Sequence, residues 1–558
     1  MGENKKNSFY IQGTILAAAS ILTRIMGIAF RIPLTRIIGD EGIGAYSNAY
    51  EIYNLALLLS TYSIPIAVSK LVSARESKKE YIKSFRVFKT AMIFSAAAGA
   101  LAALVTFFGA EYFSKTLFKS VSSAIPLKFL APTIFVFAIM GVLRGYFQGK
   151  NTMLPTAISQ LLEQLFHVVV GLVAAVIFMK LYAGSEFQVA YGAAGGTFGT
   201  LIGAVVSLLF LGAIFFMYYP TLKRRFRKDS GAQIEDYQTM LKLVLITIFP
   251  IILNQTLYSV SGTLDSVLLN SVLDSKGFSE EARLVLWGRY SSKYRLLANL
   301  PLSIASAIGV AVVPNIVRAY TENNPRLLYE KTAQAVKFNM MIAIPCAFGL
   351  AVLAKPVMFV LFNDTTEMTP LLMQLGALAI VLYAYSTTTS NVLQGLSMMR
   401  YPVIHAAAGI VIYVIIDYIL LSFFDMGVYA LIVGHTVFPL IVSMFNWLRI
   451  QMETGYKQEV FRTFLMPTVC SGIMAVISYF FYLGIHTITK SELVSLIITI
   501  IIAVIIYFVC VHIRRKIFGK LLVYGNSTFF QIGINSNVSG VVFDDRLFKH
   551  RIIPIFIW

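Results

Sequence analysis

Charged residues are scarce in this sequence. Only 13% of its 558 residues are Asp, Glu, Lys or Arg, whereas about 25% is usual for a soluble globular protein. Hydrophobic residues make up 57% of the chain, and the mean hydropathy is +0.74. Apolar stretches of about 20 residues, long enough to cross a bilayer, recur along the whole length. This composition excludes a soluble globular protein and indicates a polytopic membrane protein.

Cysteine and the common enzyme motifs are also scarce or missing. Cys346, Cys470 and Cys510 lie in apolar runs without a CxxC pair or a cluster of histidines, which argues against a metal or redox site. The sequence contains no GxSxG, HExxH, P-loop or Rossmann glycine pattern. We therefore expect a transporter rather than an enzyme, without a resident cofactor or metal.

The apolar windows predict fourteen helices, and hence an all-α integral membrane protein with about fourteen transmembrane helices. They lie near 10–38, 43–73, 83–109, 124–148, 154–182, 190–219, 237–272, 281–319, 332–354, 369–397, 401–423, 427–452, 458–485 and 491–516. With a cytoplasmic N-terminus, most Lys and Arg fall in cytoplasmic loops, so both termini are predicted to be cytoplasmic. A basic face toward anionic lipid explains the net charge of +19 better than nucleic-acid binding does.

A short internal repeat indicates two lobes. Val-Leu-x-Gly, a polar turn and then Pro occur in 142–155 and again in 392–402, six predicted helices later. The predicted architecture is two six-helix lobes, followed by two further helices and a tail without an assigned role. The alternative is that the two loops match by chance and are not a repeat. The corresponding segments are 1–230, 231–457, 458–516 and 517–558. Transporters built from repeats bind their substrate where the lobes meet, near mid-membrane.

The arginines inside the first predicted helix are expected to have a function, because an intramembrane charge is energetically costly and usually functional. Arg24 and Arg31 are seven residues apart, about 20° on a helical wheel, so they share a face. Pro33 is expected to bend the helix just beyond Arg31. Two guanidiniums on one face suit a phosphate-bearing ligand. Alternatively, they pair with Glu51 of the second helix and hold the lobe together.

The second lobe contains a comparable basic group. Arg289 and Lys293 are four residues apart on the eighth predicted helix, whereas Arg295 points about 120° away from Arg289. The three side chains therefore cannot all face one cavity. The residues alone leave open which of them faces the junction between the lobes.

Two isolated acids lie in long apolar runs. Asp265 and Asp417 belong to different predicted helices, close to hydroxyl side chains such as Thr436. Carboxylates from two helices, together with hydroxyls, could hold Na⁺ or a proton. The alternative is that each acid only forms a hydrogen bond with a neighbouring helix.

Four stretches resemble a known family: 23–33 (TRIMGIAFRIP), 64–73, 142–164 (VLRGYFQGKNTMLPTAISQLLEQ) and 294–316. The chain resembles polysaccharide-lipid exporters of the multidrug/oligosaccharidyl-lipid/polysaccharide (MOP) superfamily. Within it, the resemblance is to the stage V sporulation protein B-like group and the lipid II flippases, and it covers roughly residues 8–516. It implies a V-shaped, two-lobed transporter whose central cavity opens to alternate faces of the membrane.

The resemblance also implies roles for particular residues. In lipid II flippases, arginines of the first and eighth helices contact the lipid diphosphate, and the matching positions here are Arg24, Arg31 and Arg295. Some members bind an ion between helices seven, eleven and twelve, where Asp265 and Asp417 stand. This chain departs from the lipid II flippases in lacking an arginine on its second helix.

The resulting expectation is a flippase in the plasma membrane of a bacterium. It moves an undecaprenyl-diphosphate-linked saccharide, with lipid II as the expected cargo, to the outer leaflet for peptidoglycan or polysaccharide synthesis, driven by Na⁺, H⁺ or the membrane potential. Its partners would be the anionic lipid, membrane lipids and envelope-biosynthesis proteins. The alternatives are an exporter of another lipid-linked oligosaccharide, a cation-coupled multidrug exporter, and a membrane scaffold or glycosyltransferase of envelope assembly.

Overall fold

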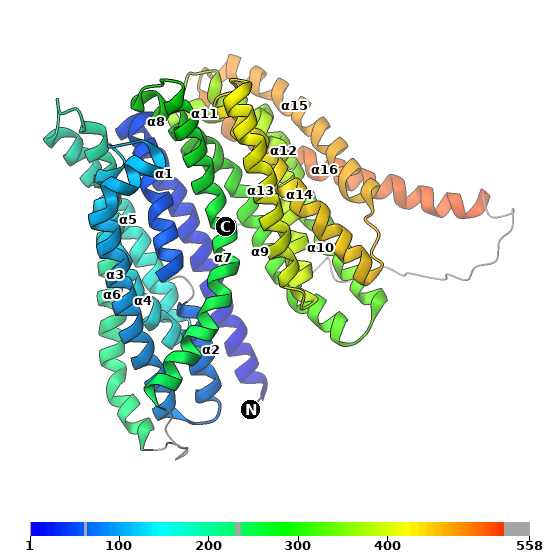
Figure 1. Ribbon diagram of the computed structural model, residues 1–558. Helices are drawn as coiled ribbons and strands as arrows, with labels where there is room; N and C mark the ends of the chain where they lie inside the picture. The colour runs from blue at the N-terminus through cyan, green and yellow to red at the C-terminus, as the bar shows by residue number, and fades with distance from the viewer. Residues whose placement is uncertain (1, 61–63, 228, 230–235, 529–558) are drawn as a thin grey trace. The chain divides into compact units, whose positions relative to one another are not determined.

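The computed structural model describes residues 2–60, 64–227, 229 and 236–528, and every element in these ranges is helical (Figure 1). The first half contains α1 (Gly2–Ser60), α2 (Ile64–Glu76), α3 (Tyr81–Phe118), α4 (Ala124–Gly149), α5 (Leu154–Leu181) and α6 (Gln188–Phe226). It is followed by α7 (Tyr237–Ser275), α8 (Glu280–Gly288), the π-helix η1 (Arg289–Tyr294), α9 (Arg295–Thr321), α10 (Pro325–Val352) and α11 (Ala354–Phe362). The remaining elements are α12 (Met368–Gly395), α13 (Arg400–Phe423), α14 (Val428–Thr454), the π-helix η2 (Phe461–Leu465), α15 (Met466–Thr489) and α16 (Glu492–Thr528).

The helices confirm the all-α fold class. Eleven of the helices found in the described ranges are long and apolar enough to cross a membrane, so the count of fourteen spans stays a prediction. The predicted helix 43–73 corresponds to the second part of α1 and to α2, and residues 61–63 between them lie outside the described residues. A short additional helix, α11, follows α10.

The break in α1 lies at Gly39, between the predicted helices 10–38 and 43–73, and confirms their separation, while the bend expected at Pro33 stays a prediction. Gly39 has φ 70° and ψ −179°, whereas Pro33 lies inside the helix. A residue without a Cβ adopts a positive φ with little strain, so glycine is the natural site for such a break. The two parts of α1 therefore correspond to the first two predicted helices, and Asp40 begins the second part.

Close packing of small residues holds α5 against α6. Gly199 and Gly203 are one turn apart on α6 and face the backbone of α5. A Cβ on Gly199 would lie 2.4 Å from the Gly171 Cα, and one on Gly203 would lie 2.3 Å from the Glu163 carbonyl oxygen. Membrane helices rely on such close approach because lipid tails are as apolar as the side chains, so the hydrophobic effect adds little.

Tyrosines fix the position of η1 within the second half of the chain. Tyr290 and Tyr294 are fully buried, and the Tyr294 hydroxyl donates to the Gly376 carbonyl of α12 at 3.3 Å. The same hydroxyl lies 2.8 Å from His435 Nδ1 on α14. Because η1 continues directly into α9, these contacts also set the position of Arg295. Helix α7 packs against α1 and α3 on one side and α13 on the other.

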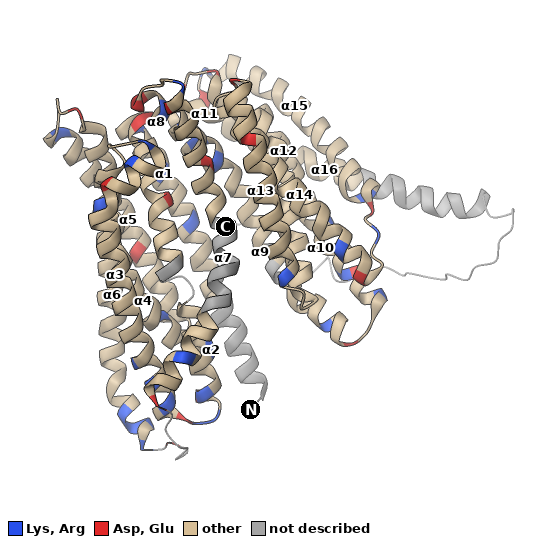
Figure 2. Cartoon of the chain, viewed as in Figure 1, with Lys and Arg blue, Asp and Glu red and all other residues tan. Residues whose placement is uncertain are grey.

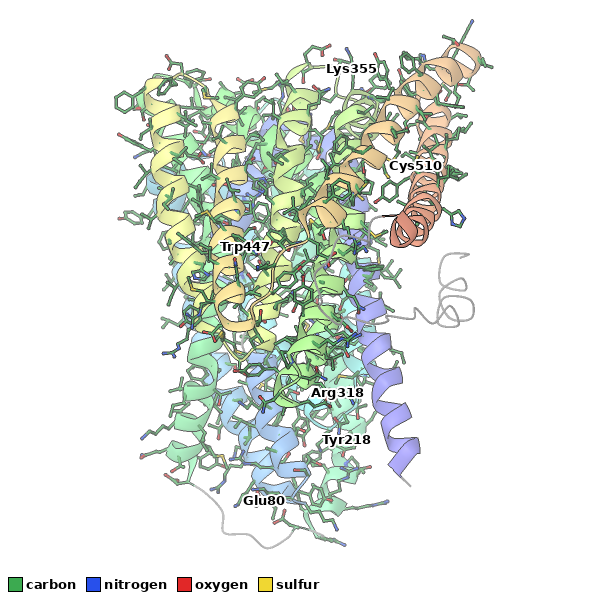
Figure 3. The ribbon with its side chains drawn as sticks, turned by 90° about the vertical axis from the view of Figure 1, so that its right-hand side faces the viewer. Glu80, Tyr218, Arg318, Lys355, Trp447 and Cys510 are labelled. Atoms are coloured by element: carbon green, nitrogen blue, oxygen red, sulfur yellow. The ribbon has the colours of Figure 1, made fainter. Side chains whose placement is uncertain are left out.

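The charged residues mark the two ends of the helices. In Figure 2, Lys and Arg gather at the lower ends of α2, α3 and α6, which belong to the side predicted to be cytoplasmic. Figure 3 places Lys355 toward the opposite end, with Tyr218 and Glu80 toward the lower one. Large apolar side chains such as Phe108 and Phe216 are exposed along the helices, as expected for surfaces that face lipid.

The chain divides into two compact units, Met1–Val504 and Ile505–Trp558. The first unit contains all the predicted site residues. Of the second, the structure describes the part of α16 that ends at Thr528, and the rest of the predicted tail lies outside the described residues. The predicted segment boundaries at 230, 457 and 516 stay predictions.

Candidate functional site

Arg31 joins α1 to η1 in the other half of the chain. Its Nη1 donates to the Ser292 hydroxyl at 3.0 Å, and that hydroxyl lies 3.0 Å from the hydroxyl of Ser47. The Arg31 Cζ also lies 4.9 Å from the centroid of the Tyr46 ring, within cation–π range. A guanidinium has five N–H donors. The contacts described here leave several of them able to bind an oxygen-rich ligand.

Arg295 and Glu51 form an ion pair between α9 and α1. Arg295 Nη1 donates to Glu51 Oε1 at 3.3 Å, and the Thr263 hydroxyl of α7 donates to Glu51 Oε2 at 3.3 Å. Gly262 allows the pair to lie against α7, because a Cβ there would be 2.6 Å from Arg295 Nη2 and 3.0 Å from both Glu51 oxygens. Glu51 therefore pairs with the second half of the chain rather than with the arginines of its own helix.

Asp265 and Asp417 are buried close to this ion pair. The Tyr290 hydroxyl donates to Asp265 Oδ2 at 3.3 Å, and Asp265 interacts electrostatically with Arg295, Glu51 and Asp417. Asp417 is 0% exposed, and the backbone N–H of Gly434 faces its carboxylate. Its carboxylate lies against Gly434, where a Cβ would be 2.1 Å from Oδ2.

Thr436 is not aimed at these acids. Its hydroxyl donates to the Ile432 carbonyl of its own helix at 2.8 Å. Within the described ranges, no group of three or more His, Cys, Asp or Glu side chains could hold a metal ion. Asp265 and Asp417 thus remain a pair of buried carboxylates from α7 and α13.

A second cluster of charges lies at the end of the helices predicted to face outward. Arg289 Nε donates to Asp40 Oδ2 at 2.8 Å, while Lys293 Nζ lies 2.6 Å from Asp40 Oδ1 and 2.6 Å from Asp364 Oδ2. Gly288 brings α1 close, because a Cβ there would be 2.1 Å from the Asp40 carbonyl oxygen. The cluster links α1, η1 and the segment between α11 and α12. We call these four charged residues the outer cluster.

The charge of Asp364 is strongly stabilised. Burial alone would raise the pKa of this carboxyl, but hydrogen bonds from Lys293 and from the Thr366 hydroxyl and backbone N–H outweigh it and lower the pKa to about 2. The Lys293 side chain is only 4% exposed, so its ammonium group depends on these carboxylates for compensation.

The structure separates the predicted basic residues into three places. Arg31 and Arg295 lie where α1 meets η1, α7 and α9, whereas Arg289 and Lys293 belong to the outer cluster. Arg24 is exposed on α1, about two turns before Arg31. Arg295 meets Glu51 and not the outer cluster, while its place in a cavity between the lobes stays a prediction.

Sequence reasoning missed the acids that these basic residues require. Asp40 and Asp364 lie in short polar segments that read as ordinary loops. A buried cation needs an acidic partner, and that rule could have drawn attention to them. Sequence reasoning also missed an ion pair within the motif 142–164. Arg144 Nη2 donates to Glu163 Oε2 at 2.7 Å and to the Ser207 hydroxyl at 3.2 Å.

Comparison with known families identifies the family of this chain. Residues 11–320 match the model of the polysaccharide biosynthesis protein family, and residues 296–419 match the MatE model. The chain belongs to the polysaccharide biosynthesis protein family. Its relatives in Bacillus subtilis include the lipid II flippase MurJ, which is 25% identical over 84% of this chain and 88% of that protein. Stage V sporulation protein B is 24% identical over 91% of this chain and 96% of its own length.

Solved structures show the same fold. The lipid II flippase MurJ in an inward closed conformation matches with a TM-score of 0.63 and 16% identity, covering 90% of this chain and 99% of that one. An inward-facing multidrug resistance MATE family transporter of the MOP superfamily matches with a TM-score of 0.61 and 16% identity, covering 78% and 94%. This chain is therefore a multi-pass membrane protein with the MOP fold, and its relatives are transporters rather than enzymes.

Proposed function

We propose that this protein is a flippase for a saccharide linked to a polyprenyl diphosphate, with lipid II as the expected cargo. The observation that carries the proposal is the position of two guanidiniums from opposite halves of the chain: Arg31 on α1 contacts Ser292 on η1, and Arg295 on α9 contacts Glu51 on α1. A planar guanidinium binds phosphate oxygens bidentately and keeps its charge at every physiological pH. The relative MurJ, a lipid II flippase, supports the same class of cargo.

The diphosphate would lie between the two arginines while the saccharide occupies the wet space between the halves. Arg24 is exposed on α1 about two turns before Arg31, on the predicted cytoplasmic side, and would attract the lipid headgroup before Arg31 does. The polyprenyl chain would remain in the bilayer, because burying it inside the protein offers no hydrophobic gain over lipid. Access would alternate between the faces, with the outer cluster closing one of them. The protein would work in a bacterial plasma membrane with both termini in the cytoplasm, alongside envelope-biosynthesis proteins.

The buried acids suggest how transport is driven. Asp265 and Asp417 would hold a coupling cation, Na⁺ or H⁺, because two buried carboxylates that interact with each other favour a bound cation or a proton. Thr436 would have to turn its hydroxyl away from Ile432 to join them. The same acids favour a second candidate, a cation-coupled multidrug exporter. Such a protein has no use for two arginines facing its cargo, so the arginine variants distinguish the two functions.

Complementation tests the proposal. The chain is expressed in a bacterium whose only lipid II flippase can be shut off, beside Arg24→Ala, Arg31→Ala and Arg295→Ala at equal membrane levels. Arg318→Ala is the control, because Arg318 is exposed and, among the described residues, forms an ion pair with Glu322 four positions later. We expect the parent and the control to rescue growth, and Arg31→Ala and Arg295→Ala to fail. Rescue by all variants would show that the arginines do not bind cargo, and absence of rescue by a well-inserted parent would exclude lipid II.

A further inference from the structure

Glu51 occupies the position at Arg295 that an anionic cargo needs. Its two carboxylate oxygens accept from Arg295 and Thr263, which lie on two different helices of the second half of the chain. The Glu51 side chain is 15% exposed and that of Arg295 is 23% exposed, so the pair is shielded from water without being sealed. The pair is therefore partly accessible at the surface of the described residues.

The charges around Arg295 are already balanced without a ligand. Arg295 interacts electrostatically with both Glu51 and Asp265, so the local charge of these three groups is −1 when all are ionised. Adding Arg31 brings the sum to zero. A diphosphate that approached this set would place two or more further negative charges beside two carboxylates, and like charges at short range in a poorly solvated site repel strongly.

We propose that Glu51 is the resident counter-anion of Arg295 and that a phosphate-bearing ligand displaces it, whereupon the Glu51 carboxylate takes up one proton from solution. The inference rests on the proposed function, because it concerns the same arginine and the same class of ligand. The step is a simple protonation: the carboxylate gains a proton and forms one O–H bond, and no other bond forms or breaks. Anion binding is thereby coupled to proton uptake at this site.

Protonation follows from what surrounds the displaced carboxylate. The charged groups that interact with Glu51 from the helices packed against α1 are Arg295 on α9 and Asp265 on α7, while Thr263 donates a hydrogen bond. Once the phosphate engages Arg295, Glu51 faces Asp265 and the phosphate with no cation of its own. Both burial and nearby negative charge favour the neutral acid.

The exchange also restores the ion pair between Glu51 and Arg295 after the cargo has left. When the cargo leaves on the far side, Arg295 loses its phosphate and attracts Glu51 again, which then releases its proton on that side. Arg295 is never left buried without an anion, a state that would cost several kcal/mol. One proton would accompany each cargo and offset part of the negative charge that the diphosphate carries.

Calorimetry on the purified full chain tests this inference. Farnesyl diphosphate is titrated into the protein in detergent at pH 7, in two buffers with different ionisation enthalpies, so that the difference in heat gives the number of protons taken up. We expect about one proton per ligand for the parent. Glu51→Gln should bind about tenfold more tightly, equivalent to about 1.4 kcal/mol, with proton uptake near zero, because the amide neither competes as an anion nor titrates.

Glu163→Gln is the matched control. It makes the same chemical change at a membrane-embedded glutamate of the first half, one that pairs with Arg144 instead of Arg295. We expect it to keep the parent's proton count and affinity. Equal proton counts and equal affinities in the parent and Glu51→Gln would overturn the inference while leaving the proposed function standing. If neither the parent nor a monodisperse Glu51→Gln binds farnesyl diphosphate, the proposed function itself is wrong.

Discussion

Replacing Lys293 by methionine should open the end of the protein that the outer cluster closes. Methionine keeps the length of the side chain but removes the ammonium group that lies 2.6 Å from both Asp40 and Asp364. Two carboxylates from different segments of the chain would then face each other with one cation fewer. The contact between α1 and the segment preceding α12 should weaken, while the interior of each half is left as it is.

The size of the effect follows from the burial of the group. Breaking a buried ion pair by removing one partner costs about 3–5 kcal/mol. The lower end applies here, because Asp40 keeps its bond to Arg289 and Asp364 keeps those to Thr366. A loss of about 3 kcal/mol corresponds to a change of roughly 150-fold in the equilibrium between closed and open forms.

Thiol labelling can measure that change. In a chain whose three cysteines are replaced by serine, Ser47→Cys provides a reporter that lies two turns after Asp40 on α1 and is only 4% exposed. A membrane-impermeant maleimide is added to intact cells, and the labelling rate reports how often the outer end opens. We expect Lys293→Met to raise the rate by about two orders of magnitude.

Lys355→Met is the matched control on the same side of the protein. Lys355 also lies 2.6 Å from a carboxylate, that of Glu367, but the two side chains are 70% and 79% exposed. Exposed ion pairs contribute about 0–1 kcal/mol, so this variant should label like the parent. Equal labelling rates for Lys293→Met and Lys355→Met would refute the assignment of the outer cluster as the closing contact.

Three further predictions follow from the same structure. Because the pKa of Asp364 is lowered to about 2, its ionised contribution is complete above the ordinary value of 3.8 and is lost only as the pH falls through about 2. Labelling of the parent, divided at each pH by the labelling rate of a free thiol, should therefore not change between pH 5 and pH 8. Gly199→Val should place a Cβ 2.4 Å from the Gly171 backbone and lower the free energy of unfolding by about 1–3 kcal/mol. The assay is the loss of monodisperse protein on heating. Gly212→Val on the same helix, with open space around it, should behave like the parent. Asp417→Asn should abolish any dependence of transport on Na⁺ or on a pH gradient, and transport that keeps the parent's cation dependence in this variant would exclude Asp417 from coupling.

The sequence predicts the helices well because their signal is local. Apolar runs of the length of a membrane span, separated by loops with an uneven distribution of Lys and Arg, identify each helix without reference to its neighbours. The break at Gly39 falls between the predicted helices 10–38 and 43–73, so its place is readable from the sequence. Its positive φ is visible only in the structure, because the sequence pattern does not give backbone angles.

The site was predicted only in part because its contacts join distant segments. A helical wheel separates Arg295 from Arg289, but it cannot supply their partners, Glu51 and Asp40, which lie more than 200 positions earlier in the chain. The wheel also assumes a regular α-helix, whereas this stretch passes through the π-helix η1. The acidic partners become visible only when the two halves of the chain are packed together.

The central claim is that Arg31 and Arg295 carry a polyprenyl-diphosphate-linked saccharide across the membrane. Its most direct test is reconstitution of the purified chain into liposomes whose lipid includes a fluorescent polyprenyl-diphosphate saccharide, with a membrane-impermeant quencher added outside. We predict that the parent and Arg318→Ala move the probe between leaflets at equal rates, whereas Arg31→Ala and Arg295→Ala do so no faster than protein-free liposomes. Equal rates for all four proteins would contradict the account.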